Sequence, residues 1–180
     1  LMQDGKALQA GTSHFLGQNF AKAFDVKYMN SENKEELVWA TSWGVSTRLV
    51  GGLIMTHSDD EGLVLPPRLA PEQVVIVPIT LKKKPELSAQ VMEKANEMFA
   101  QLKSAGIRVH MDDREGYSNG FKYNEWELKG VPIRVEFGPR DMENNQCVLV
   151  KRNTGEKETV SLTNLTSKTT ELLTTSGLKV

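Results

Sequence analysis

The segment LPPRLAPEQVVIVPIT, residues 65–80, marks a boundary in the chain, because the sequence patterns before and after it differ. Three prolines within residues 66–71 indicate a stiff, extended connector. The apolar run that follows, residues 74–79, is typical of a strand buried on both faces of a sheet. We therefore expect a linker at 66–73 and a separate domain over 74–180.

Helical and extended patterns alternate after this strand. Apolar residues recur at helical spacing over 86–104, and Gly106 is placed to cap that helix. Further elements are expected as strands at 107–111, 131–138, 147–153 and 157–162, and as helices at 119–130 and 166–175. The order β-α-β-α-β-β-β-α predicts a small α/β domain with a mixed sheet and helices on its faces.

The residues before the linker have a different pattern. The stretch ALQAGTSHFLGQNFAKAF, residues 7–24, predicts a strand that enters a helix near Phe15. Short strands are expected at 25–29 and 37–44, separated by a polar turn. Residues 46–57 predict a helix that Ser46 caps, with an apolar stripe that packs against a neighbour.

Composition excludes several classes of protein. The chain has 180 residues and a formal net charge of −1, which excludes a strongly basic nucleic-acid binder of the histone kind. Cys147 is the one cysteine, so this chain builds neither a disulfide framework nor a cysteine zinc site. We expect Cys147 to be a buried structural thiol. No apolar run approaches the roughly 18 residues of a membrane span.

Two polar groups before the linker are candidates for chemistry. A bulge at Gly11 would place three polar side chains, those of Gln9, Thr12 and His14, on one face of the strand. Alternatively, the strand is half exposed and its polar side chains simply point to solvent. Arg48 lies at the start of a predicted helix, directly after a strand ends. A helix N-terminus and a guanidinium together can bind a phosphate; alternatively, this is an ordinary helix start with an exposed arginine. The run HSDDE, residues 57–61, is interpreted as a solvated loop in preference to a metal site.

Cations and aromatic residues are interleaved after the linker. In the strand at 131–138, Arg134 and Glu136 alternate with apolar residues, which predicts a polar face. Such a mixture can bind single-stranded RNA by base stacking; alternatively, the aromatic rings pack the core of a solvated domain. The residues concerned are six cations expected to be exposed, Lys122, Lys129, Arg134, Arg140, Lys151 and Arg152, and the rings of Phe121, Tyr123 and Trp126.

Five segments together resemble the prolyl-tRNA synthetases, which are class II aminoacyl-tRNA synthetases. They are ALQAGTSHFLGQNFAKAF, TSWGVSTR, GLVLPPRLAPEQVVIVPI, GFKYNEWELKGVPIRVEFGPRDME and VKRNTGEKETV, and they extend from about Ala7 to Leu162. The resemblance implies that residues 1–65 are the C-terminal portion of the catalytic domain, an antiparallel sheet with helices. It implies an anticodon-binding domain with a mixed five-stranded sheet over 74–180.

The resemblance also implies roles for individual residues. Arg48 corresponds to the catalytic arginine of class II motif 3, which holds ATP. The other implied ATP contacts are Gln9, Thr12 and Ser46, and the implied proline-binding residues are His14, Trp43 and Gly44. Anticodon or tRNA contacts are expected at Lys122, Arg134, Glu136 and Arg140.

The implied activity is ligation of L-proline to tRNA(Pro), with ATP and Mg²⁺ as a substrate complex. A cytoplasmic homodimer is expected, without zinc in this segment and without a membrane. Motifs 1 and 2 are not found in these 180 residues, so we expect the segment alone to be inactive. The alternative is a free-standing tRNA- or RNA-binding module with a non-catalytic synthetase remnant.

Overall fold

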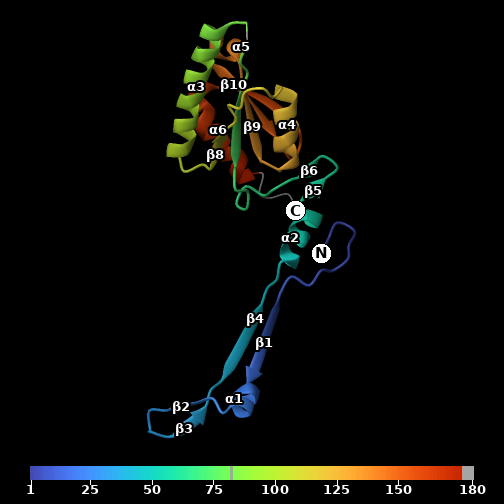
Figure 1. Cartoon of the computed structure of the whole chain (residues 1–180), viewed down its shortest axis with the longest axis vertical. Helices are drawn as coiled ribbons and strands as arrows, with labels where there is room; N and C mark the ends of the chain where they lie inside the picture. Colours follow the sequence, from blue (N-terminus) through green and yellow to red (C-terminus); the bar gives the residue numbers. More distant parts are fainter. Residues whose placement is uncertain (82, 176–180) are drawn as a thin grey trace. The chain divides into compact units, whose positions relative to one another are not determined.

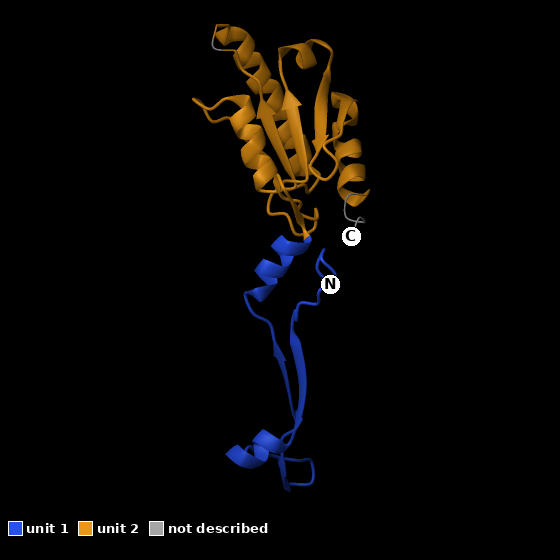
Figure 2. Cartoon of the chain, turned by 90° about the vertical axis from the view of Figure 1, so that its right-hand side faces the viewer, with its two compact units in different colours: residues 1–56 blue, residues 57–180 orange. Residues whose placement is uncertain are grey.

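A computed structural model describes residues 1–81 and 83–175 of the chain (Figure 1). The chain divides into two compact units, residues 1–56 and residues 57–180, called here the first and second units (Figure 2). The division falls after Thr56, so the expected linker at 66–73 lies inside the second unit. The last five residues of the domain expected over 74–180 lie outside the described residues.

The second unit contains a mixed five-stranded sheet, as the sequence predicts. Its spatial order is β11-β10-β9-β7-β8; β7 is parallel to β8 and β9, whereas β10 is antiparallel to β9 and β11. The strands are β7 (Val74–Pro78), β8 (Val109–Met111), β9 (Ile133–Phe137), β10 (Gln146–Lys151) and β11 (Lys157–Ser161). The apolar run that opens the domain is fully buried in β7, which confirms the prediction of a strand covered on both faces.

Helices cover both faces of this sheet. Helices α3 (Pro85–Ser104) and α6 (Leu165–Thr175) pack with β7, β9 and β10 in one hydrophobic core (Figure 1). On the opposite face α4 (Asn119–Leu128) packs Trp126 against β7. Cys147 is buried in the larger core, and burial raises the pKa of its thiol to about 12, as expected of a structural cysteine.

One helix and one short turn interrupt the predicted order. Helix α5 (Pro139–Glu143) follows β9, and the 3₁₀ turn η1 (Leu162–Asn164) precedes α6. Pro139 suits the first turn of α5, and the Gly138 N–H donates to Asp141 Oδ2 at 2.9 Å. Five residues are too few to show helical periodicity, so hydrophobic spacing does not reveal α5.

The second unit begins with a hairpin where a solvated loop was expected. Strands β5 (Ser58–Asp59) and β6 (Gly62–Leu63) pair antiparallel. A Cβ on Gly62 would lie 2.5 Å from Leu128 Cα, and a Cβ on Gly130 would lie 2.6 Å from Leu63 Cβ. Because both contacts join the hairpin to the end of α4, residues 57–65 belong to the second unit.

The first unit consists of two small antiparallel pairs and two helices. Strand β1 (Thr12–Gly17) pairs with β4 (Ala40–Gly44), and β2 (Lys27–Met29) pairs with β3 (Glu35–Leu37). The helices are α1 (Asn19–Phe24) and α2 (Arg48–Thr56). The expected start of a helix near Phe15 is wrong, because Phe15 pairs with Thr41 in the β1–β4 ladder.

The first unit has almost no core of its own. Among its residues, all of which the structure describes, Ala21 is the one classed as buried. The apolar stripe of α2 is exposed, including 60% of Val50 and 47% of Ile54. Residues 1–56 therefore do not contain the packing partner that the sequence predicts for this stripe.

Candidate functional site

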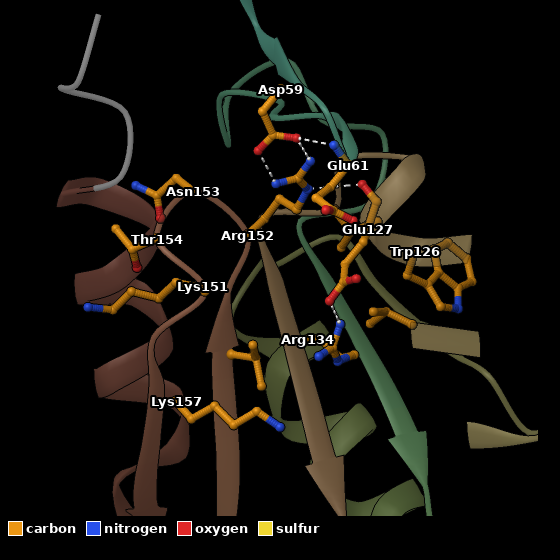
Figure 3. Close-up of a pocket in the computed structure, with 14 residues that line it drawn as sticks. Asp59, Glu61, Trp126, Glu127, Arg134, Lys151, Arg152, Asn153, Thr154 and Lys157 are labelled. Atoms are coloured by element: carbon orange, nitrogen blue, oxygen red, sulfur yellow. Dashed lines mark hydrogen bonds and ion pairs between the residues drawn. The ribbon is translucent and has the colours of Figure 1, made fainter. Parts of the chain in front are cut away.

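A cavity of about 380 Å³ opens in the second unit on the face that carries α4 (Figure 3). Four cationic side chains line it, together with three carboxylates and a few apolar groups. The charged lining residues are Arg134, Lys151, Arg152, Lys157, Asp59, Glu61 and Glu127. The lining therefore combines charged hydrogen-bond donors and acceptors with apolar surface.

Four adjacent strands form part of the cavity wall. Strand pairing aligns Lys157 with Val150, Val150 with Arg134, and Arg134 with Val75. Directly paired residues project from the same face of a sheet, so these side chains form one row. Arg134 and Glu136 thus share the face predicted from their alternation in the sequence.

That polar face is covered, not exposed. Arg134 is 7% exposed and Glu136 is 9% exposed, so the expectation that Arg134 is an exposed cation is wrong. Arg134 donates from Nε and Nη2 to Glu136 Oε1 at 3.1 and 3.0 Å, and from Nη1 to Glu127 Oε1 at 2.7 Å. Because α4 supplies Glu127, a strand pattern alone does not predict this burial.

An aromatic ring and a lysine complete the Arg134 cluster. The Arg134 guanidinium carbon lies 4.3 Å from the Tyr123 ring centroid, and Lys157 Nζ lies 3.2 Å from Glu136 Oε2. Burial, followed by the charge of Glu136, raises the pKa of Tyr123 to about 12, so its hydroxyl stays protonated. Tyr123 and Glu127 are four residues apart on α4, a spacing that could have suggested a shared helix face.

Arg152 forms another part of the wall. It donates from Nη1 and Nη2 to the two Asp59 carboxylate oxygens at 2.7 and 2.5 Å, and from Nε to the Glu127 carbonyl at 3.0 Å (Figure 3). Its side chain is 6% exposed, which corrects the expectation of an exposed cation. No sequence pattern brings Asp59 and Arg152 together, because 93 residues separate them.

Lys122 lies in a separate polar cluster. Its Nζ donates to the Asp112 carbonyl at 3.0 Å and lies 3.7 Å from Asp112 Oδ1. The expected exposure is wrong, since Lys122 is 5% exposed. Burial alone would raise the pKa of Asp112, but hydrogen bonds from Arg114 and Trp126 and the charge of Lys122 lower it. Lys122 therefore neutralises a buried carboxylate.

Arg140 stands apart from both clusters. It is exposed in α5 and does not line the cavity. Of the four residues expected to contact tRNA, the structure brings together Arg134 and Glu136, and it leaves Lys122 and Arg140 elsewhere. Glu127, Lys157 and Asp59 are the neighbours that sequence reasoning did not include as site residues, whereas Arg152 was among the cations considered for RNA binding.

In the first unit the expected ATP-contacting residues lie together. Gln9 Nε2 donates to Thr12 Oγ1 at 2.9 Å, and Arg48 Nη1 donates to Gln9 Oε1 at 3.3 Å. Ser46 Oγ accepts the Arg48 N–H at 3.3 Å at the start of α2. Gln9 precedes β1, so the hydrogen bond to Thr12 forms without a bulge at Gly11.

The expected proline-binding residues divide between two faces. His14 pairs with Ser42, and Trp43 pairs with Ser13, so His14 and Trp43 occupy alternating positions of the ladder. Their side chains therefore project from opposite faces of the β1–β4 pair. Gly44 pairs with Thr12, which places it at the register of the ATP-contacting group.

Over residues 1–81 and 83–175, no three histidine, cysteine, aspartate or glutamate side chains are grouped so that they could hold a metal ion. Within the same ranges, no helix combines the length and apolar character that crossing a membrane requires.

The chain is similar to known proteins along most of its length. Residues 73–172 match a family model described as the anticodon binding domain. The chain is 60% identical over 173 residues to a proline–tRNA ligase of Flavobacterium johnsoniae, covering 96% of this chain and 35% of that protein. It is 57% identical over 165 residues to proline–tRNA ligase 2 of Clostridioides difficile, covering 92% and 33%.

A proline–tRNA ligase of Bacteroides fragilis is 62% identical over 161 residues, covering 89% of this chain and 32% of that protein. The chain thus spans about a third of the length of the curated relatives it matches. The family model covers more than half of the chain and coincides with the mixed sheet and helices of the second unit. The chain belongs to the family of anticodon-binding domains.

Proposed function

We propose that this chain is the anticodon-binding region and part of the catalytic domain of a proline–tRNA ligase. The observation that carries the proposal is the cavity of the second unit, which Arg134 lines while hydrogen-bonded to Glu136, in a matched anticodon-binding domain. The names of the relatives support the choice of proline and do not favour a free-standing RNA module.

The chemistry of the cavity suits anticodon bases. Arginine donors match the O6 and N7 acceptors of guanine, and a carboxylate can accept from base amino groups. Proline anticodons share two adjacent guanines. Lys151 and Lys157 supply positive charge for the phosphates, and Tyr123 presents a ring beside Arg134. Lys122 and Arg140 do not line this cavity, so in this proposal neither of them reads the anticodon bases.

The first unit supplies one side of the catalytic site. Gln9, Thr12, Ser46 and Arg48 would bind ATP with its Mg²⁺, and the hydrogen bonds between them support a shared role. His14, Trp43 and Gly44 remain proposed proline contacts; the strand register favours His14 and Gly44 on one face. We keep the assignment to the catalytic domain for residues 1–56, because residues 57–65, which the sequence placed with them, belong to the second unit.

The proposed reaction has two steps. The proline carboxylate attacks the α-phosphorus of ATP, pyrophosphate leaves, and prolyl-adenylate forms. The terminal ribose hydroxyl of tRNA(Pro) then attacks the prolyl carbonyl, and AMP leaves. Such chemistry depends on positioning and on charge neutralisation, which the guanidinium of Arg48 can supply without a side-chain nucleophile. A homodimeric state and a cytoplasmic location belong to the same proposal and rest on the resemblance alone.

Binding to tRNA tests the proposal directly. The 180-residue chain is titrated with a tRNA(Pro) transcript and with a matched transcript in which both anticodon guanines are replaced. We expect the replacement to weaken binding about tenfold or more, since each mismatched contact costs roughly 1–3 kcal/mol. Equal affinity for the two transcripts would overturn the assignment of anticodon reading.

Activity of the chain tests the division between the two domains. We expect no proline-dependent exchange of pyrophosphate into ATP by residues 1–180 alone, because the arginine of motif 2 is not among them. Robust exchange would contradict the proposal that this segment supplies only part of the catalytic site.

A further inference from the structure

The β5–β6 hairpin lies upstream of the segment that matches the anticodon-binding family. That match begins at residue 73, yet Asp59 and Glu61 of the hairpin line the same cavity as Arg134 (Figure 3). The cavity is therefore incomplete without residues that the family model does not include.

The hairpin is fixed to the end of α4 by close backbone packing. Gly62 and Gly130 both have positive φ angles, and both approach the other segment more closely than any Cβ would allow. The Leu65 N–H donates to the Gly130 carbonyl at 3.3 Å. The position of Asp59 is thus set by the same segment that carries Glu127 into the cavity.

Asp59 is itself held in one orientation. Besides its two bonds from Arg152, it accepts the Glu61 N–H on Oδ1 at 2.9 Å. Hydrogen bonding from Arg152 is the main influence that lowers the pKa of Asp59 to about 2, so the carboxylate is ionised at neutral pH. A bidentate pair between a carboxylate and a guanidinium fixes direction as well as distance.

Arg152 retains capacity to bind a further group. A guanidinium has five N–H donors, and the bonds to Asp59 and to the Glu127 carbonyl use three of them. The two remaining hydrogens are on Nη1 and Nη2, and Arg152 lines the cavity. Its orientation therefore decides which acceptor of a bound molecule it can reach.

We propose that Asp59 is a positioning residue, which holds Arg152 so that its free donors meet the RNA bound in the cavity. The hairpin is then a functional wall of the anticodon site, contributed by the chain that precedes the matched domain. This inference rests on the proposed function, because it takes the anticodon loop of tRNA(Pro) as the ligand.

Matched substitutions separate positioning from simple electrostatics. Asp59→Asn removes one negative charge and one hydrogen-bond acceptor for Arg152. Asp60→Asn is the control: it removes one negative charge from the same hairpin, but Asp60 is exposed and does not line the cavity. Removing negative charge alone should leave RNA binding unchanged or strengthen it. We expect Asp59→Asn to weaken binding of the 180-residue chain to tRNA(Pro) about fivefold or more, and Asp60→Asn not to weaken it.

A double-mutant cycle then tests whether Asp59 acts through Arg152. In an Arg152→Ala background, Asp59→Asn should cause no additional loss of tRNA affinity. A full additional loss would overturn the proposal, and so would equal behaviour of the Asp59→Asn and Asp60→Asn variants. If the Asp59→Asn variant does not fold, Arg152→Lys is tested instead. Lysine keeps the positive charge but lacks the planar guanidinium that binds Asp59 through two hydrogen bonds. Unchanged tRNA affinity of Arg152→Lys would then contradict the proposal.

The wild-type chain distinguishes failure of this inference from failure of the proposed function. If the wild type does not discriminate tRNA(Pro) from the transcript with replaced anticodon guanines, the proposed function is wrong, and this inference is wrong with it. If it does discriminate, and Asp59→Asn binds as tightly as Asp60→Asn, only the role of Asp59 is wrong.

Discussion

The two units of this chain bury their apolar residues to very different degrees. In the second unit, residues 74–77 are completely buried and both sheet faces are covered by helices. In the first unit, Phe24 is 72% exposed and Trp43 is 80% exposed. The second unit therefore has the core of an independently stable domain, whereas the first needs an apolar partner surface to cover it.

The difference fits the proposed function. Proteins seldom leave so many large apolar side chains in water unless another surface covers them. The relatives are about three times as long as this chain, and we propose that the remainder of the catalytic domain covers the first unit. The anticodon unit carries its own core and its own cavity, so it can hold its RNA-binding residues in place without that cover.

The largest predicted effect tests the core of the second unit. Phe137→Ala should lower the free energy of unfolding by about 3–5 kcal/mol, because it removes a fully buried ring from the larger core. Phe24→Ala in the first unit should change it by less than about 0.5 kcal/mol. Urea denaturation followed by circular dichroism measures both. Similar losses of stability in the two variants would contradict the conclusion that only the second unit has a packed core.

A smaller effect is predicted for the buried lysine of the second unit. Lys122→Met leaves Asp112 with Arg114 and Trp126 but removes one compensating charge, so we expect the free energy of unfolding to fall by about 1–3 kcal/mol. Arg140→Ala, at an exposed site, should change stability by less than about 0.5 kcal/mol. Thermal melting compares the two. A stable Lys122→Met protein with weakened tRNA binding would instead favour a direct contact with RNA.

The smallest effect concerns pH. The pKa of Asp59 is lowered from 3.8 to about 2 in the folded protein, so its stabilising contribution is complete above pH 3.8 and disappears as the pH falls towards 2. Asp59 is 45% exposed, so solvent screening limits this contribution to about 1 kcal/mol or less. Unfolding of the wild type and of Asp59→Asn between pH 5 and 2 should show a smaller pH dependence for the variant. Identical profiles would show that the ion pair does not stabilise the hairpin.

Much of the second unit could be predicted because its signals are local. The buried run in β7 and the apolar stripe of α3 reflect one strand and one helix, and periodicity detects such elements directly. The strands expected at 147–153 and 157–162 are likewise found as β10 and β11. Where each element is decided by its own residues, the sequence predicted its type and approximate position.

The errors have a common cause in contacts between distant segments. Arg134 is buried because α4 places Glu127 and Tyr123 over it, and residues 57–65 join the second unit because Gly62 meets Leu128. The pair between Asp59 and Arg152 similarly depends on tertiary packing. The cluster of Gln9, Thr12 and Arg48 was expected from family resemblance, whereas spacing alone left its role open.

Hydrogen exchange with and without tRNA(Pro) compares the two units in a single measurement. We expect tRNA to slow exchange of backbone amides in the segments that form the cavity wall, around residues 57–63, 126–134 and 150–157. We expect no slowing in residues 1–56, which exchange quickly in both states because they have almost no core. Protection confined to residues 1–56, with none around Arg134 and Arg152, would show that the cavity of the second unit is not the site that binds tRNA.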